Sequence, residues 1–212
     1  MALSVLIVDD HRLTATALAD SLSVRGMEVA GVCHSVGDAV GSVQARQPDV
    51  VITDLDLGVG PTGIDLALTL RKKYPRIGLV LLTAYEDPKL LAADTPVPPA
   101  EAVYLVKQRL NQVDDLVAAI DLAFDYARNP QKVPRAPFRF PLSGPQAEVL
   151  RLLAQGASNH SIAEQLHLTP DAVAKAINRL AKRFGLGQSE DTNVRVLLTQ
   201  RYFDLVGYQR EL

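Results

Sequence analysis

Four short apolar runs, far apart in the chain, each end in a reactive polar residue. Leu3–Val8 precedes Asp9 and Asp10, Val50–Thr53 precedes Asp54, Leu79–Leu82 precedes Thr83, and Ala102–Val106 precedes Lys107. Short continuous apolar runs are typical of strands buried on both faces, as in a parallel sheet flanked by helices. Ligands bind at the carboxyl ends of such strands. We therefore expect three carboxylates, one hydroxyl and one ammonium to meet in a single pocket.

The segments between these runs have helical periodicity, so the first 128 residues alternate between strand and helix. A further strand is expected at Glu28–Val32, and helices after Asp10, at Val36–Arg46, at Ile64–Lys73, from Asp87-Pro88 onward, and at Leu110–Arg128. Five strands and five helices predict an α/β fold with a doubly wound, five-stranded parallel sheet and right-handed crossovers.

A proline-rich stretch divides the chain into two domains. Residues 129–141 contain Pro130, Pro134, Pro137 and Pro141 and little periodicity, which indicates a semi-rigid linker. We expect one domain at residues 1–128 and a small all-α domain at residues 142–212. In the second domain, Ser143 and Gln146 have the spacing of a capping box at the start of a helix. A short helix is expected next at Ser161–Leu166, and Thr169-Pro170 should start a helix that runs to about Arg183. Ser189 or a neighbour should start the last helix.

The charge is distributed unevenly between these parts. Residues 1–128 carry a net charge of −6, residues 129–141 carry +3, and residues 142–212 carry +1. The first part would repel a polyanion, so a nucleic-acid partner would have to meet the second. The single cysteine, Cys33, excludes an internal disulfide and fits a reducing cytosol. With no expected signal peptide or membrane span, we predict a cytoplasmic protein.

The predicted pocket suits a divalent cation and a phosphoryl group. Mg²⁺ requires hard oxygen ligands, which Asp10 and Asp54 would provide, with Asp9 close enough to hold a coordinated water. An aspartate carboxylate can attack phosphorus and form an acyl phosphate. Lys107 would then contact one phosphoryl oxygen, and the Thr83 hydroxyl would donate to another.

At these residues the chain resembles the receiver domain of two-component response regulators, a flavodoxin-like fold. The resemblance covers residues 1 to about 128. It implies that Asp9 and Asp10 are the acidic pair, Asp54 the phospho-acceptor, Thr83 the switch hydroxyl, Tyr104 the switch aromatic and Lys107 the family's lysine. It also implies Mg²⁺ as cofactor with the Asp56 backbone carbonyl facing it, and a sensor histidine kinase as phosphoryl donor.

The chain departs from this family in two places, and the second of them falls on the expected output face. Leu57-Gly58 replaces the usual Met-Pro, and Thr95-Pro96-Val97-Pro98-Pro99-Ala100 replaces Gly-Ala-x-Gly before the fifth strand. Because prolines cannot continue a helix, we expect the fourth helix to be short.

The second domain has the pattern of a helix-turn-helix, with Pro170–Arg183 as the helix for the major groove. The residues left exposed on it include the expected DNA contacts Lys175, Asn178, Arg179, Lys182 and Arg183. Residues 142 to about 184 resemble the LuxR-type helix-turn-helix. The resemblance rests on Leu142-Ser143, Glu148–Gly156, Ser158-Asn159, Ile162-Ala163 and Leu168. Ala174 and Ala176 replace polar residues of that family, so we expect weak DNA binding by a monomer, with a homodimer or the basic linker compensating.

These features predict a response regulator of the NarL/LuxR type, which is a transcriptional regulator controlled by phosphorylation. We expect it to bind double-stranded DNA as a homodimer and not to be an enzyme. Two alternatives remain open. One is an atypical regulator that does not use phosphorylation or that binds a protein instead of DNA. The other is an aspartyl-phosphate phosphatase, because Asp54-Leu55-Asp56 resembles the Asp-x-Asp motif of haloacid-dehalogenase-type phosphatases. There the motif belongs on the first strand, whereas here it follows the third of the five expected strands.

Overall fold

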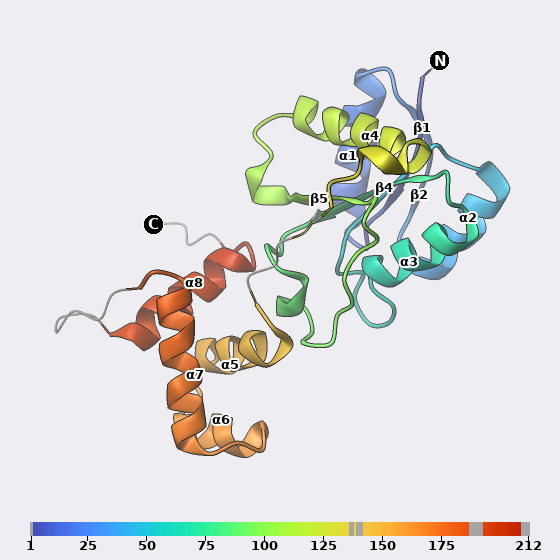
Figure 1. The fold of residues 1–212 in the computed structure, drawn as a ribbon. Coiled ribbons are helices and arrows are strands. Elements are labelled where there is room, and N and C mark those ends of the chain that lie inside the picture. Colours follow the sequence, from blue (N-terminus) through green and yellow to red (C-terminus); the bar gives the residue numbers. More distant parts are fainter. Residues whose placement is uncertain (1, 136–137, 139–141, 187–192, 209–212) are drawn as a thin grey trace. The chain divides into compact units, whose positions relative to one another are not determined.

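The chain folds into two compact units, each of which is built from two separate stretches of sequence. The computed structural model describes residues 2–135, 138, 142–186 and 193–208 (Figure 1). The first unit consists of Met1–Ala84 and Pro96–Arg139, and the second of Tyr85–Thr95 and Phe140–Leu212. The division at residues 139 and 140 falls inside the stretch predicted as a linker, where one 3-10 turn, η3 (Pro130–Lys132), is present. The exact domain boundaries stay a prediction.

A five-stranded parallel sheet forms the centre of the first unit. Its strands are β1 (Ser4–Val8), β2 (Glu28–Cys33), β3 (Val50–Thr53), β4 (Gly78–Thr83) and β5 (Val103–Val106), in the order β2-β1-β3-β4-β5. The sequence prediction of a five-stranded parallel sheet is confirmed. The strand order reverses beside β1, so the ends of β1 and β3 flank the point where ligands bind in such sheets.

Helices cover both faces of this sheet (Figure 1). They are α1 (Arg12–Val24), α2 (Val36–Arg46), α3 (Gly63–Lys73) and α4 (Val113–Arg128). On one face, Leu22 of α1 and Ile120 of α4 are fully buried in a core with Ile7 and Ile52. Alternate residues of each strand point to opposite faces, so α2 and α3 pack on the other one (Figure 1). Burial on both faces explains why the central strands β1, β3 and β4 are almost continuously apolar.

The fourth helix is short, as expected, but it is a single 3-10 turn and not an α-helix. Asp87 does cap a helical start, because its side chain accepts the N–H of Lys89, but only one 3-10 turn follows, η1 (Pro88–Leu90). The prolines from Pro96 onward lack the N–H that helix continuation requires. In addition, Leu90 is buried in the core of the second unit, and this tertiary contact fixes the segment.

The described part of the second unit consists of η1 and four α-helices. These helices are α5 (Gly144–Ala154), α6 (Asn159–Gln165), α7 (Pro170–Arg183) and α8 (Val194–Leu205). The predicted caps are present: Gln146 Oε1 accepts Ser143 N–H at 3.0 Å, and Thr169 Oγ1 accepts Ala172 N–H at 3.2 Å. Ser189 lies outside the described residues, and α8 is capped by Asn193.

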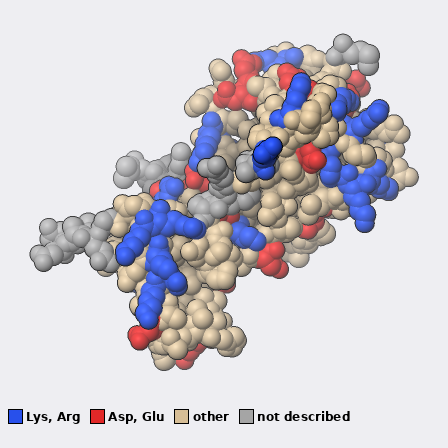
Figure 2. Space-filling view, viewed as in Figure 1, with Lys and Arg blue, Asp and Glu red and all other residues tan. Residues whose placement is uncertain are grey.

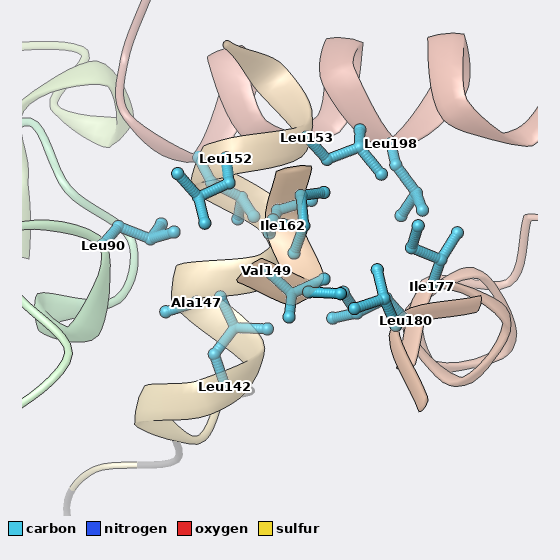
Figure 3. Packing of buried hydrophobic residues seen from close by; sticks show 14 residues of the cluster. Leu90, Leu142, Ala147, Val149, Leu152, Leu153, Ile162, Ile177, Leu180 and Leu198 are labelled. Atoms are coloured by element: carbon cyan, nitrogen blue, oxygen red, sulfur yellow. The ribbon is translucent and has the colours of Figure 1, made fainter. Parts of the chain in front are cut away.

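Leucine, isoleucine and valine side chains from every element of the second unit meet in one core (Figure 3). Leu150 of α5, Ile162 of α6, Leu180 of α7 and Leu198 of α8 are all fully buried in it. Leu90 of η1 completes one side. Among the described residues, no helix is both long and apolar enough to cross a lipid bilayer.

Candidate functional site

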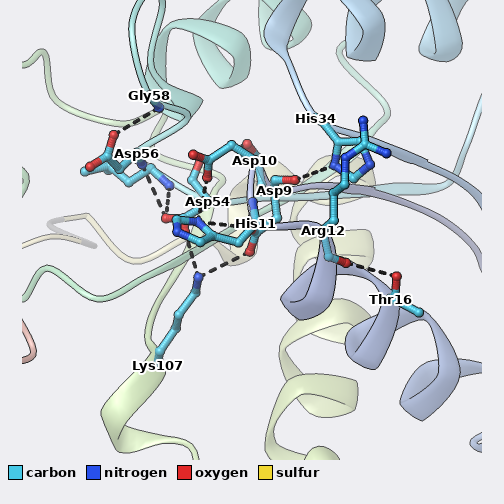
Figure 4. Close-up of polar contacts among 12 residues, drawn as sticks. Asp9, Asp10, His11, Arg12, Thr16, His34, Asp54, Asp56, Gly58 and Lys107 are labelled. Carbon is cyan, nitrogen blue, oxygen red and sulfur yellow. Dashed lines mark hydrogen bonds and ion pairs between the residues drawn. The ribbon is translucent and has the colours of Figure 1, made fainter.

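The carboxyl ends of β1, β3 and β5 bring three of the predicted site residues together (Figure 4). Asp9 follows β1, Asp54 follows β3, and Lys107 follows β5. The N–H of Asp54 donates to the carbonyl of Val8 at 2.8 Å, so the ladder between β3 and β1 continues to the acceptor residue itself. The position of the Asp54 backbone is therefore set by the sheet. Asp9 and Asp54 are both buried, at 2% and 8% exposure.

Lys107 links the two buried carboxylates. Its Nζ lies 2.6 Å from Asp54 Oδ2 and 3.3 Å from Asp9 Oδ2. Burial raises the pKa of Asp54, although the hydrogen bond and charge of Lys107 oppose the rise. Burial alone would lower the pKa of Lys107, but the hydrogen bonds and charges of Asp54 and Asp9 outweigh it, so this pKa is raised. Lys107 is therefore a permanent cation in the pocket.

The second oxygen of Asp54 is held by the backbone. Oδ1 accepts the N–H of Leu55 at 2.6 Å and that of Asp56 at 3.3 Å. The chain then returns to Gly63, where an added Cβ would stand 1.8 Å from the Asp54 carbonyl oxygen. Glycine is therefore required at this close approach. The sequence reasoning missed Gly63, although a glycine at the start of a helix that follows an acidic loop was the available signal.

Asp9, Asp10 and His11 form the group of ligand atoms that could hold a cation within the described part of the chain. These atoms all lie within 4.8 Å of one another. Asp9 Oδ1 accepts His11 N–H at 2.8 Å, and His11 Nδ1 lies 2.9 Å from Asp10 Oδ1. The His11 side chain is 76% exposed and stands at the N-cap position of α1. The site holds oxygen donors of the kind that Mg²⁺ prefers.

Two further contacts shape the edges of this pocket. His34 was not singled out from the sequence, yet its Nδ1 lies 2.8 Å from the carbonyl oxygen of Asp9. Asp56 lies in the loop after β3, where its Oδ1 accepts the N–H of Gly58 at 3.2 Å. The predicted role of the Asp56 carbonyl in metal binding stays a prediction.

Thr83 and Tyr104 lie on the neighbouring strands β4 and β5. Thr83 ends β4 and is fully buried. Tyr104 pairs with Leu81 in the register between the two strands. The Tyr104 ring meets the ring of Phe138 edge-on, with centroids 6.3 Å apart and planes at 65°. The contact could not be predicted, because Phe138 belongs to the stretch that was interpreted as a linker.

The second candidate surface is the exposed side of α7. All five predicted contact residues are exposed there: Lys175, Asn178, Arg179, Lys182 and Arg183. Val173, Ile177 and Leu180 form the opposite, buried side. Figure 2 shows a row of Lys and Arg side chains over the part of the second unit that α7 occupies in Figure 1. Arg183 also donates to Gln146 Oε1 at 3.0 Å, so its head group is tied to the start of α5.

A tight turn joins α6 to α7. His167 adopts a left-handed backbone with φ of 54°, and Leu168 N–H donates to the Ala163 carbonyl at 2.8 Å. The two helices and this turn have the arrangement of a helix-turn-helix, in which the second helix enters the major groove of DNA.

Comparison with known protein families agrees with the families predicted for both domains. Residues 5–120 match the family of the response regulator receiver domain, and residues 141–192 match the bacterial regulatory proteins of the luxR family. The DNA-binding transcriptional activator DevR/DosR of Mycobacterium tuberculosis is 29% identical over 209 residues, covering 92% of this chain and 94% of that protein. The DNA-binding transcriptional activator EvgA of Escherichia coli is 25% identical, covering 85% and 91%.

The same fold occurs in solved structures. A structure of the two-component response regulator RcsB in complex with DNA superposes with a TM-score of 0.55 at 20% identity, covering 97% of this chain and 100% of that one. This chain therefore belongs to the response regulators, with a receiver domain followed by a LuxR-family DNA-binding domain. The two relatives named above are DNA-binding transcriptional activators.

Proposed function

We propose that this response regulator accepts a phosphoryl group on Asp54 from a sensor histidine kinase in the cytoplasm, and that the phosphorylated homodimer binds double-stranded DNA through α7. One observation supports the phosphorylation of Asp54 above all others. The Asp54 carboxylate is clamped between the Lys107 ammonium and two backbone N–H groups. It also stands next to Asp9, which shares the same ammonium.

The two Asp54 oxygens differ in how firmly they are held. Oδ1 accepts N–H groups of the backbone, which cannot withdraw, whereas Oδ2 is held by the flexible side chain of Lys107. We therefore assign Oδ2 as the nucleophile. Its attack forms the O–P bond while the bond from phosphorus to the kinase histidine nitrogen breaks and that nitrogen keeps the electron pair. Lys107 then moves to a phosphoryl oxygen, and the Thr83 hydroxyl donates to another.

Asp9, Asp10, Asp54 and the Asp56 carbonyl would hold Mg²⁺. These are hard oxygen donors, and the two buried carboxylates share a single ammonium, so the pocket retains excess negative charge. Bound Mg²⁺ would neutralise charge that develops on the phosphoryl oxygens. Tyr104, which packs on Phe138, would change its position as Thr83 moves toward the phosphoryl group.

A small phosphodonor such as acetyl phosphate tests the acceptor. Asp54→Asn should abolish acyl-phosphate formation, detected as a mass increase of the intact chain. Asp56→Asn is the matched control, because it keeps the backbone carbonyl and should leave labelling intact. Labelling that survives in Asp54→Asn would place the acceptor elsewhere.

The phosphatase alternative is addressed by the same pair of variants. Asp54-x-Asp56 follows the third strand of the chain, and not the first as in those phosphatases. In such an enzyme Asp56 would be needed for turnover of a phosphate ester. Steady ester hydrolysis that Asp56→Asn abolishes would favour the phosphatase over the regulator.

The exposed side of α7 supports the DNA half of the proposal. Lys175 and Arg179 are one helical turn apart and Asn178 stands beside them, so these three can reach base edges together. Replacing all three by alanine should abolish specific operator binding in a mobility-shift assay. Unchanged affinity would overturn the groove assignment.

A phosphorylation-independent or protein-binding regulator is the second candidate. The observation that favours it is the replacement of the expected fourth helix by η1. A mobility-shift assay of wild type and Asp54→Asn, each with and without phosphodonor, separates the two. Phosphodonor should increase binding by wild type and not by the variant. Equal binding in all four samples would favour the alternative.

A further inference from the structure

The segment of residues 85–95 belongs to the DNA-binding unit, although it lies in the sequence between two strands of the receiver sheet. Four contacts join it to α5, to α8 and to Leu142, which lies two residues before α5 begins. The first is made by Asp87, which is fully buried. Its Oδ1 accepts Lys89 N–H at 2.9 Å and its Oδ2 accepts Leu142 N–H at 2.8 Å. One carboxylate thus holds both η1 and the chain just before the Ser143 cap of α5.

The second and third contacts are made by Leu90 and Glu86. Leu90 is 3% exposed and is part of the core that α5, α6, α7 and α8 share (Figure 3). Glu86 N–H donates to the carbonyl of Leu205 at 2.9 Å, and its carboxylate lies 3.8 Å from Arg201 of α8. The segment therefore contributes both apolar packing and backbone hydrogen bonds to this unit.

The fourth contact is steric. A Cβ added to Gly144, the first residue of α5, would stand 2.4 Å from the carbonyl oxygen of Ala93. Only glycine allows the 85–95 segment to lie this close to the start of α5. Glycine is otherwise a poor residue in a helix, so its presence here fits the docked segment.

The segment is also joined covalently to the phosphorylation pocket. Thr83 ends β4, and Tyr85, two residues later, already packs against the core of the DNA-binding unit. Consecutive Cα atoms are about 3.8 Å apart, so the connection through Ala84 has little slack. A displacement of the Thr83 backbone must be absorbed by Ala84 or passed on to Tyr85.

We propose that the 85–95 segment couples the phosphorylation pocket to the DNA-binding unit: movement of Thr83 toward a phosphoryl group on Asp54 loosens the packing of this segment on α5 and α8. The coupling rests on the proposed function, whereas the docking of the segment does not. In the structure Lys107 occupies Asp54 Oδ2, so the docked segment belongs to the unphosphorylated state.

Gly144→Ala in the full chain tests the docking. Where the segment is docked, the new methyl group must displace the Ala93 carbonyl, so residues 85–95 should exchange their amide hydrogens faster and Tm should fall. Where it is not docked, alanine should leave Tm unchanged or raise it, because alanine favours helix. Gly41→Ala is the matched control, since Gly41 lies inside α2 with no atom within 4 Å of an added Cβ. Unchanged exchange and Tm in Gly144→Ala would overturn the docking.

Hydrogen exchange with and without acetyl phosphate and Mg²⁺ tests the coupling. In labelled wild type, amides of residues 85–95 and the amide of Leu142 should exchange several-fold faster, and in Asp54→Asn they should not change. The mass of the same samples reports labelling of Asp54. Labelled protein with unchanged exchange would overturn the coupling and leave the proposed function standing. Absence of labelling would overturn both, independently of the result for Gly144→Ala.

Discussion

Lys107 Nζ lies 2.6 Å from Asp54 Oδ2, the oxygen that we assign as the nucleophile. The ammonium and a divalent cation therefore compete for the same oxygens. The same contact explains why Asp54 is stable as a buried carboxylate before any cation binds, since an unpaired buried charge would be strongly unfavourable.

We expect Lys107→Gln to bind Mg²⁺ more tightly than wild type, because the competing positive charge is gone. The gain should be roughly tenfold, equivalent to about 1.4 kcal/mol, measured by isothermal titration calorimetry. Lys132→Gln removes an exposed ammonium that pairs with Asp125, and it should leave the affinity unchanged. An affinity of Lys107→Gln equal to that of wild type would show that Lys107 does not oppose the cation.

The edge-on contact between Tyr104 and Phe138 should be measurable as a coupling free energy. Single and double replacement of the two rings by leucine, compared by thermal unfolding, should give a coupling of about 0.5–1.5 kcal/mol. A coupling near zero would mean that the rings do not pack on each other in solution. If Tyr104 turns inward on phosphorylation, the coupling should shrink with phosphodonor present.

Ala174→Lys should strengthen DNA binding. Ala174 lies on α7 beside the exposed Lys175, and the resemblance to the LuxR-type helix-turn-helix implies a polar residue at this position. One more phosphate contact should steepen the dependence of log affinity on log salt by about 0.9. Ala174→Gln adds a similar side chain without the charge and should keep the wild-type slope. Equal slopes for lysine and glutamine would mean that residue 174 does not face the phosphates.

Leu90→Ala should destabilise the DNA-binding unit, because it removes a buried side chain that belongs to its core. Substitutions of this kind cost about 2–5 kcal/mol. Val97→Ala, at a site that is 61% exposed, is the control and should have little effect. Calorimetric unfolding of the full chain measures both. A loss for Leu90→Ala no larger than that for Val97→Ala would contradict the packing.

The buried carboxyl of Asp87 should make the stability depend on pH. Burial raises its pKa, against the opposing hydrogen bonds from the backbone of Lys89 and Leu142. The folded state therefore binds the proton more tightly than the unfolded state, and the stability that this group contributes is lost as pH rises through the raised pKa. The difference in free energy of unfolding between wild type and Asp87→Asn should favour wild type more at pH 4 than at pH 7. The reverse trend in urea denaturation would contradict a raised pKa.

Local sequence patterns were sufficient for the sheet and most helices. Four-residue β3 and the whole of α2 and α7 have the predicted bounds, because continuous apolar runs and capping residues mark them directly. The convergence of Asp9, Asp54 and Lys107 followed from the rule that parallel strands end at one edge of the sheet.

Features that depend on contacts between distant residues escaped prediction. Gly63 is required by the carbonyl of Asp54, and His34 meets the carbonyl of Asp9 from the end of β2. Asp87-Pro88 is a good start for a helix of any length, so its pattern does not say that only one turn follows. No local pattern indicates whether Leu90 is buried in the core of the first unit or in that of the second.

The discontinuity of the DNA-binding unit constrains how such a gene can recombine. A crossover within residues 129–141 would supply α5 to α8 from a relative while keeping the segment of residues 85–95 from this chain. The residue that replaces Gly144 in the transplanted helix would then have to fit against the Ala93 carbonyl of this chain. Leu90 of this chain would have to pack into the core of the transplanted helices. We therefore expect residues 85–95 to be inherited together with α5 and α8, so that the modular unit of exchange is larger than the helix-turn-helix.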